Sequence, residues 1–380
     1  MNNTRVAKWD NVKFLMILCV VLGHTLYEFM GSNTEMAKGI YFFIYTFHMP
    51  VFIFLTGMFA KHMIDQKRYD RVIEYLFIYL VMKFLDYFGG CLTSVTKKDD
   101  FISLRFFSEI KEGLTTPNKG FHLFWEDGPA WFALAIAVFI FVTINIRNVD
   151  RKIVLTSAIV LGCLAGLDNH LGNHFASMRL CTFYPVFLMG YYTDRKIFEQ
   201  TEKTTWHSKI VFSKLLSAAI LIIMLAVSLI FSSDLYSKIN FLKGKNDYMA
   251  LGFGVNGVAY RLLCYILWMV FIIAVINICP QREYFWSWLG TRTMSIFIWH
   301  KFILIIILKL CYGKYFIKYR MPHYYIIAAI CIAVIITVIT AYLPEFRISR
   351  WTKNLRKKCI KVEPGEKIVL DGTDDSFGRE

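Results

Sequence analysis

Three histidines lie inside long apolar stretches of this 380-residue chain: His24, His48 and His300. An ionisable side chain is costly in an apolar surrounding, so an imidazole placed there is by default a functional group. Burial favours the neutral form of the ring, which can take a proton from a hydroxyl group or carry an acyl group on nitrogen. The chemistry indicated is proton abstraction or nucleophilic transfer in an apolar environment.

Basic residues lie at the ends of the same stretches. Lys13 precedes His24 by eleven residues, which on an α-helix is a rotation of about 1100° and a rise of roughly 16 Å, so the two residues share a face. Asp10 lies one turn before Lys13 and can pair with it. The helix face that carries Lys13 and His24 suits an elongated molecule whose phosphates contact Lys13 and whose far end reaches His24. Alternatively, Lys13 only snorkels to a membrane surface beside a helix-starting Asp10.

A second basic cluster contains Lys67, Arg68 and Arg71. Lys67 and Arg71 are four residues apart, so on one helix they would project together and could clamp phosphate oxygens. The alternative is a cluster that only orients the neighbouring membrane spans.

The apolar stretches that must position these groups approach membrane length. Hydrophobic residues make up 56% of the chain and charged residues 19%, against about 45–50% and about 25% in soluble domains. A span needs roughly 20 apolar residues. The candidate spans are 14–30, 40–60, 72–90, 129–146, 153–167, 176–193, 212–232, 258–279, 290–311 and 324–343. We therefore predict an all-α integral membrane protein of about ten transmembrane helices; the segment 176–193 is the weakest, because it contains Arg179.

The distribution of lysine and arginine predicts the orientation of the spans. Basic residues gather before the first span and in alternate loops, and the positive-inside rule assigns those loops to the cytoplasm. The net charge of +15 thus reflects topology and not nucleic-acid binding. Both termini are expected in the cytoplasm, with His24 and His48 at similar depths on antiparallel neighbouring spans. Residues 1–346 would form the membrane domain and 347–380 a cytoplasmic tail or linker, first basic and then acidic.

The remaining features add few functional residues. The nine cysteines show no metal-binding spacing, so we predict neither a metal site nor a disulfide framework. The apolar stretch from Phe14 is interpreted as a retained first span, because no signal-peptide cleavage site follows it. The long loop at 91–128 is large enough to cover an external cavity or to form an interfacial helix, and the loop at 233–256 is polar and glycine-rich.

Short motifs make the chain resemble membrane-bound acyltransferase family 3. The resemblance is strongest to its branch of fucose-4-O-acetylase-like and capsular polysaccharide O-acetyltransferases. The motifs occur in family order at 9–13 with 20–24, 47–52 with 56–57, 129–132, 184–192 and 290–300. Each is weak alone, but the ordered set covers nearly all of residues 9–345 and is fairly specific.

The resemblance implies ten core spans, acetyl-CoA as acyl donor, and a basic residue before the histidine of the first span, here Lys13 and His24. The wider family also has an Arg-x-x-x-Arg pair after the second span, which here reads Lys67-x-x-x-Arg71. At the first position of the pair, the lysine ammonium of Lys67 replaces a guanidinium that could bind phosphate through two hydrogen bonds. The adjacent Arg68 still offers a guanidinium.

Residues and resemblance together predict a membrane O-acetyltransferase of the bacterial plasma membrane. It would move an acetyl group from cytoplasmic acetyl-CoA to a hydroxyl group of an envelope or extracellular glycan or glycolipid, without a metal. Partners would be the lipid bilayer and the acceptor, with no nucleic acid, and a homodimer is left open. The assigned roles are catalysis for His24, His48 and Asp10, donor binding for Lys13, Lys67, Arg68 and Arg71, and substrate binding for His300, Trp131 and Ser295. Ser295 or Asn11 is a candidate donor to an oxyanion.

Three alternatives stay open. An envelope transporter or flippase would use the histidines as relay groups, and Pro50 and Pro185 would break its helices, but no inverted repeat is evident. Family-3-like domains are also found fused to an amino-acid racemase in glycopeptide-resistance proteins, where a role in serine supply is ascribed to them. A structural membrane partner without chemistry is disfavoured by the three intramembrane histidines.

Overall fold

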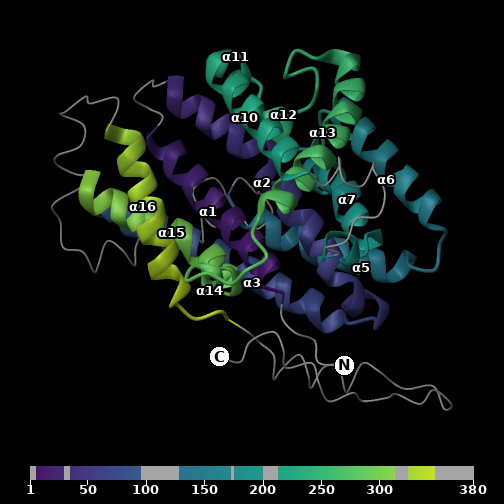
Figure 1. The fold of residues 1–380 in the computed structure, drawn as a ribbon, viewed down its shortest axis with the longest axis horizontal. Helices are drawn as coiled ribbons and strands as arrows, with labels where there is room; N and C mark the ends of the chain where they lie inside the picture. Colours follow the sequence, from purple (N-terminus) through teal and green to yellow (C-terminus); the bar gives the residue numbers. More distant parts are fainter. Residues whose placement is uncertain are drawn as a thin grey trace.

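A computed structural model describes residues 6–29, 35–95, 128–172, 175–199, 213–312 and 324–346. Every regular element in these ranges is a helix (Figure 1), so the all-α prediction is confirmed for this part of the chain. The loop predicted at 91–128 and the tail from 347 lie mostly or wholly outside the described residues.

Each of the ten predicted apolar segments coincides with a helix. These helices are α1 (Ala7–Phe29), α2 (Glu35–Asp65), α3 (Tyr69–Val95), α5 (Trp131–Ile146), α6 (Arg151–Leu164), α7 (Ser177–Tyr192), α10 (Lys214–Ile230), α13 (Gly257–Ile278), α15 (Thr293–Tyr312) and α16 (Tyr324–Ala341). By length and composition, the segments Ala7–Glu28, Glu35–Asp65 and Gly254–Ile278 are each able to cross a membrane. Four more are shorter apolar helices: Trp131–Ile146, Lys214–Ile230, Thr293–Ile307 and Ile326–Ala341. The number of crossings and their orientation stay predictions.

Helix α2 lies at the centre of the bundle. Helices α1, α7, α10 and α13 pack around it, while α1 is covered on its other side by α15 and α16. Helix α3 packs between α5 and α15. Both α2 and α7 continue through their internal prolines, Pro50 and Pro185, so neither is broken there.

Helices α2 and α7 approach each other closely where they cross. A Cβ atom added to Gly57 would collide with the carbonyl oxygen of Phe187, and one added to Gly190 would collide with that of Phe54. The two backbones therefore touch, as at small-residue crossings in membrane proteins. The weakest predicted segment, 176–193, is thus a complete helix held tightly against α2.

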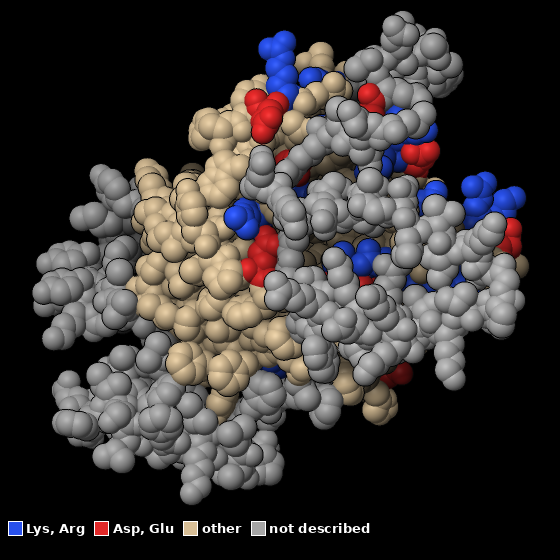
Figure 2. Space-filling view, turned by 90° about the horizontal axis from the view of Figure 1, so that it is seen from below, with Lys and Arg blue, Asp and Glu red and all other residues tan. Residues whose placement is uncertain are grey.

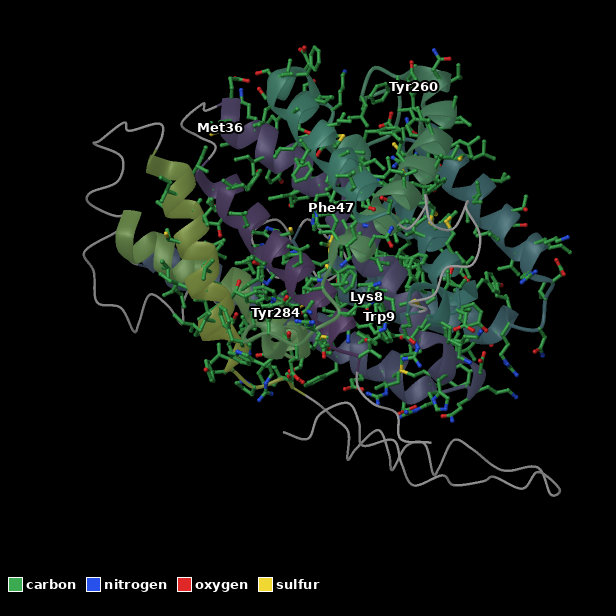
Figure 3. The ribbon with its side chains drawn as sticks, viewed as in Figure 1. Lys8, Trp9, Met36, Phe47, Tyr260 and Tyr284 are labelled. Atoms are coloured by element: carbon green, nitrogen blue, oxygen red, sulfur yellow. The ribbon has the colours of Figure 1, made fainter. Side chains whose placement is uncertain are left out.

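The first turns of α1 are tied to two short helices, α8 (Lys196–Glu199) and α14 (Ser287–Thr291). The Lys8 ammonium donates to the carbonyl of Phe198 at 2.9 Å, and the Trp9 indole donates to the Glu199 carboxylate at 2.7 Å. On the side of α14, Gly290 lies so close that an added Cβ would collide with a backbone carbonyl of α1. Figure 3 shows Lys8 and Trp9 in the lower part of the bundle, and Met36 and Tyr260 at the opposite end.

The segment predicted as a polar loop at 233–256 is folded. It contains α11 (Ser232–Ser237), α12 (Ile239–Lys243) and a 3-10 turn at Gly254–Asn256. The buried Arg261 of α13 donates to the carbonyl of Phe241 at 2.6 Å, and the Tyr248 hydroxyl donates to the carbonyl of Cys163 at 2.9 Å. These buried bonds anchor the segment to α6 and α13, so it is a fixed part of the bundle.

Candidate functional site

His24, His48 and His300, here called the histidine cluster, come together from α1, α2 and α15. The ring centroids of His24 and His300 are 5.2 Å apart, with 44° between the planes. His48 lies on α2, which packs against α1. Within the described ranges, no three His, Cys, Asp or Glu side chains are arranged to hold a metal ion. His24 and His300 are closely spaced imidazoles, and their geometry suits proton transfer.

Gly23 allows α1 and α2 to meet at the level of the cluster. A Cβ atom on Gly23 would lie 3.2 Å from Cε2 of Tyr45 and 3.8 Å from Cγ2 of Ile44. The Tyr45 ring in turn packs edge-on against His48, with 4.6 Å between the centroids. Helices α1 and α2 are therefore neighbours, as expected, whereas the depths of His24 and His48 in a membrane stay a prediction.

Backbone carbonyls fix the tautomers of two cluster members. Nδ1 of His48 lies 2.7 Å from the carbonyl oxygen of Ile44, and Nδ1 of His300 lies 2.8 Å from that of Phe297. A carbonyl only accepts hydrogen bonds, so each Nδ1 carries the proton and Nε2 of the neutral ring keeps a lone pair. Nε2 of His300 is buried and has no hydrogen-bond partner among the described residues. Such an orphaned acceptor fits a site that receives a donor from a ligand.

The residues on either side of His300 hold α15 in place. Trp299 donates from its indole nitrogen to the carbonyl of Pro344 at 3.0 Å. Lys301 forms an ion pair with Asp86 of α3 at 2.6 Å. One neighbour is thus tied to the segment after α16 and the other to α3, and these two bonds hold the turn of α15 that carries His300.

Three tyrosines and a lysine, here called the tyrosine–lysine group, lead to the histidine cluster: Tyr27, Tyr41, Tyr45 and Lys243. The Lys243 ammonium donates to the Tyr41 hydroxyl at 2.6 Å and lies 4.6 Å from the centroid of the Tyr45 ring. Tyr27 is 54% exposed, whereas Tyr41 is 1% exposed. The group therefore runs from the surface of the bundle inward, and the Tyr45 ring ends it against His48.

Trp131 lies beside a buried charge. The guanidinium of Arg179, on α7, sits 5.1 Å from the centroid of the Trp131 ring. Phe183 stacks on Trp131 with 5.4 Å between the centroids. Trp131, assigned to substrate binding from the sequence, is thus packed against an aromatic ring and a buried cation, and its role at a substrate stays a prediction.

At the other end of α1, Lys13 and Asp10 form the expected pair. Lys13 Nζ lies 3.8 Å from Asp10 Oδ1 and 4.7 Å from the centroid of the Phe59 ring of α2. Helix α1 runs without a break from Ala7 to Phe29. The common face of Lys13 and His24 deduced from the spacing therefore holds.

The structure changes the interpretation of the Lys67–Arg71 cluster. Helix α3 begins at Tyr69, and Lys67 lies in the preceding turn with a φ of 52°. The prediction that Lys67 and Arg71 project together from one helix is therefore wrong.

Both arginines of this cluster already have carboxylate partners. Arg68 pairs with Asp70 at 3.0 Å, and Arg71 pairs with Glu74 at 2.7 Å. Burial lowers the pKa of Arg71, but the Glu74 carboxylate more than offsets this, so the pKa lies above its usual value. A phosphate at these arginines would have to compete with the two carboxylates.

The two candidate oxyanion donors are engaged in contacts between helices. The Ser295 hydroxyl, fully buried, lies 2.6 Å from the carbonyl oxygen of Thr340 and 2.6 Å from that of Leu343. Asn11 donates to the carbonyl of Pro280 at 2.9 Å, and its oxygen accepts from the hydroxyl of Ser287 at 2.6 Å. Their role at an oxyanion stays a prediction without support from these contacts.

Two basic residues at these sites were not singled out from the sequence. Lys243 belongs to a segment interpreted as a polar loop, and Arg195 to a cluster explained by the positive-inside rule. Arg195 lies 5.7 Å from the centroid of the Phe59 ring, which also contacts Lys13. Only the tertiary contacts distinguish these two from the other basic residues, since spacing along the chain gives no signal.

A family model described as an acyltransferase domain matches residues 6–342. The nodulation protein NolL of Sinorhizobium fredii (strain NBRC 101917 / NGR234) is 26% identical over 214 residues, which cover 55% of this chain and 54% of that protein. The match thus spans about half the length of this relative. No solved structure matches the chain.

Proposed function

The chain belongs to membrane-bound acyltransferase family 3, and we propose that it is an O-acetyltransferase of the bacterial plasma membrane. It transfers an acetyl group from cytoplasmic acetyl-CoA to a hydroxyl group of an envelope or extracellular glycan. The observation that carries this proposal is the pairing of His24 and His300, with a ring separation of 5.2 Å and a buried Nε2 of His300 that lacks a partner among the described residues.

His24 acts as the general base in this scheme. It takes the proton of the acceptor hydroxyl while the hydroxyl oxygen attacks the thioester carbonyl carbon. The tetrahedral intermediate collapses with cleavage of the C–S bond, the acetyl ester forms, and the CoA thiolate leaves and takes up the proton. Nε2 of His300 accepts a hydrogen bond from the acceptor hydroxyl or from the protonated His24, so His300 positions the reacting groups. An acetyl group carried on His24 is the two-step version of the same transfer.

The donor approaches from the end of α1 that carries Lys13. Its phosphates lie at that end, which we place at the cytoplasmic face of the membrane, and its pantetheine arm follows α1 for roughly 16 Å to His24. Figure 2 views the molecule from the lower edge of Figure 1 and shows lysine and arginine side chains on this face beside aspartate and glutamate. Ion pairs such as Lys13–Asp10 belong to this end of the bundle.

The acceptor enters from the opposite end, along the tyrosine–lysine group. Aromatic rings offer a stacking surface for sugar rings, and the hydroxyl and ammonium groups offer hydrogen bonds to sugar hydroxyls. The group ends at His48, against which the Tyr45 ring packs, and the Lys243 ammonium lies 4.6 Å from the centroid of the same Tyr45 ring. An acceptor bound there would reach the histidine cluster from the side opposite to the donor.

Analysis of the host glycan tests the proposal. A strain that lacks the protein should lose acetyl esters from one surface glycan, as measured by mass spectrometry of the purified glycan. The wild-type gene should restore them, and the variant His24→Ala should not, at equal protein levels in the membrane. Unchanged acetylation in the His24→Ala strain would refute the scheme.

A binding measurement separates the enzyme from the transporter and serine-supply alternatives. Acetyl-CoA or CoA should raise the thermal unfolding temperature of the purified protein, because a ligand that binds the native state stabilises it. A transporter of another solute has no reason to show this shift. Stabilisation by serine and not by CoA would favour the serine-supply alternative.

A further inference from the structure

We infer that Arg195 joins Lys13 in binding the phosphate groups of the acyl donor, and that Arg68 and Arg71 do not have this role. The inference rests on the proposed function, since it names a residue that binds the donor. It deepens that function by separating two basic clusters that the sequence alone could not rank.

Two cationic side chains from distant parts of the chain meet at one ring. Lys13 Nζ lies 4.7 Å from the centroid of Phe59, and Arg195 Cζ lies 5.7 Å from it. Trp9 packs edge-on against the same ring at 5.6 Å, next to the start of α1. Both cations thus contact one ring, and an anion bound beside this ring is attracted by both charges.

The backbone around Arg195 is held in place on both sides. Before it, α7 is locked to α2 by the glycine crossing described above. After it, the Lys8 ammonium donates to the carbonyl of Phe198 at 2.9 Å, and the Trp9 indole donates to Glu199 at 2.7 Å. Arg195 is thus kept beside the helix that carries Lys13, and a binding site gains affinity when its groups are positioned in advance.

Arg195 is also available to a ligand. Its side chain is exposed, and within the described residues it forms neither an ion pair nor a hydrogen bond, its contact being the ring of Phe59. The adjacent Asp194 carboxylate is turned to its own backbone, where it accepts from the amide of Lys196 at 3.0 Å. On the Lys13 side, the Asp10 carboxylate lies 3.8 Å from the Lys13 ammonium.

The arginines of the two basic clusters differ in their ion-pair partners. Arg68 and Arg71 have carboxylate partners at 3.0 and 2.7 Å, whereas Arg195 has none among the described residues. A guanidinium offers planar pairs of N–H donors that match phosphate oxygens, and an ammonium does not. Arg195 therefore adds a guanidinium to the Lys13 ammonium at this end of the bundle.

The test compares two donors that differ in their phosphates. Acetyl-CoA and S-acetylpantetheine carry the same thioester, but only acetyl-CoA has the phosphorylated nucleotide. With the purified full-length protein, Arg195→Gln should raise KM for acetyl-CoA about tenfold at unchanged kcat, while KM for S-acetylpantetheine stays the same. For Arg195→Lys, KM for acetyl-CoA should lie between those of the wild type and Arg195→Gln. The matched control Lys196→Gln changes the next exposed side chain and should behave as wild type.

Three results would overturn the inference. Arg195→Gln could leave KM for acetyl-CoA unchanged, or raise KM for both donors equally. Alternatively, Arg68→Gln or Arg71→Gln could show the phosphate-specific loss while Arg195→Gln does not.

A wild-type protein that uses neither donor would refute the proposed function and not this inference. CoA-induced thermal stabilisation would then decide the role of Arg195. Loss of the stabilisation in Arg195→Gln supports the site, and its retention overturns it.

Discussion

His24 on α1 and His300 on α15 lie with 5.2 Å between their ring centroids, one near the beginning of the chain and the other near its end. The contact requires that α15 pack against α1, which it does together with α14 and α16. His300 is completely buried and its Nδ1 is committed to backbone carbonyls, so only Nε2 can serve a ligand or a second imidazole. The pair is the part of the structure best suited to proton transfer.

Replacing His24 by alanine should abolish most of the acetyl transfer. A general base contributes about 10²- to 10⁴-fold to a rate, so kcat should fall by that order while KM for acetyl-CoA stays near the wild-type value. Release of CoA in the presence of acceptor is the measurement. His170→Ala is the matched control, because His170 is exposed and paired with Asp168 at 3.2 Å, outside the bundle core. Full activity of His24→Ala would remove His24 from the mechanism.

His300 should act through His24, and a double-mutant cycle can show this. His300→Ala alone should lower kcat about 10- to 100-fold, which corresponds to roughly 1.4–2.8 kcal/mol of transition-state stabilisation. In the His24→Ala background the same change should have little further effect, because residues that act as a unit are not additive. Purely additive losses would indicate that His300 supports the fold and not the reacting pair.

The sequence was sufficient for the helices and for the three histidines, because both signals are local. Apolar segments of near-membrane length identified ten helices, and imidazoles within them marked the cluster. The segment 176–193, the weakest of the predicted membrane spans, is a full helix that packs on α2 where Gly57 and Gly190 let the two backbones touch. The sequence pattern of the segment did not reveal this contact.

Other site residues could not be predicted from spacing. The prediction that the Lys67 and Arg71 side chains project together assumed a continuous helix, but the positive φ of Lys67 places this residue in a turn. Lys243 looked like one of several polar loop residues, and its contact with Tyr41 depends on how Arg261 anchors Phe241. Such contacts join segments that are distant in the sequence, so the amino-acid sequence alone does not indicate them.

The α2–α7 crossing predicts a sharp effect of small substitutions. Gly57→Ala and Gly190→Ala should each lower the stability of the protein by about 1–3 kcal/mol or more, because an added methyl group collides with a backbone carbonyl that cannot rotate away. The thermal unfolding temperature in detergent is the measurement. Gly172→Ala is the control, since a Cβ there meets no atom within 4 Å. Equal melting temperatures for all three variants would contradict the close approach.

Labelling of single cysteines tests the proposed orientation. Cysteines introduced at Lys61 and Lys196 should react with a membrane-impermeant thiol reagent only after the membrane is opened, because we place both at the cytoplasmic face. A cysteine at Asp247, in the segment after α12, should react in intact cells. The background is a variant in which the native cysteines are replaced. Labelling of Lys196→Cys from outside would show that α7 does not cross the membrane and would invert every later span.

Lys243 should determine how tightly the acceptor binds. Its ammonium lies 4.8 Å and 4.6 Å from the ring centroids of Tyr41 and Tyr45 and donates to the Tyr41 hydroxyl at 2.6 Å, on a segment held by buried hydrogen bonds. A hydrogen bond to a charged group is worth about 1.5–3 kcal/mol, so Lys243→Met should raise KM for the acceptor about tenfold or more. KM for acetyl-CoA should not change, because the donor enters from the opposite end of α1.

Two further variants make the Lys243 measurement specific. Tyr41→Phe removes the hydroxyl but keeps the ring, so its effect on the acceptor KM should be smaller than that of Lys243→Met. Lys238→Met is the matched control, because Lys238 belongs to the same folded segment and donates to the carbonyl of Leu251 at 3.1 Å, away from the tyrosines. It should lower thermal stability and leave the acceptor KM unchanged. If Lys243→Met and Lys238→Met alter stability alike and neither alters the acceptor KM, Lys243 holds the fold together and the acceptor enters elsewhere.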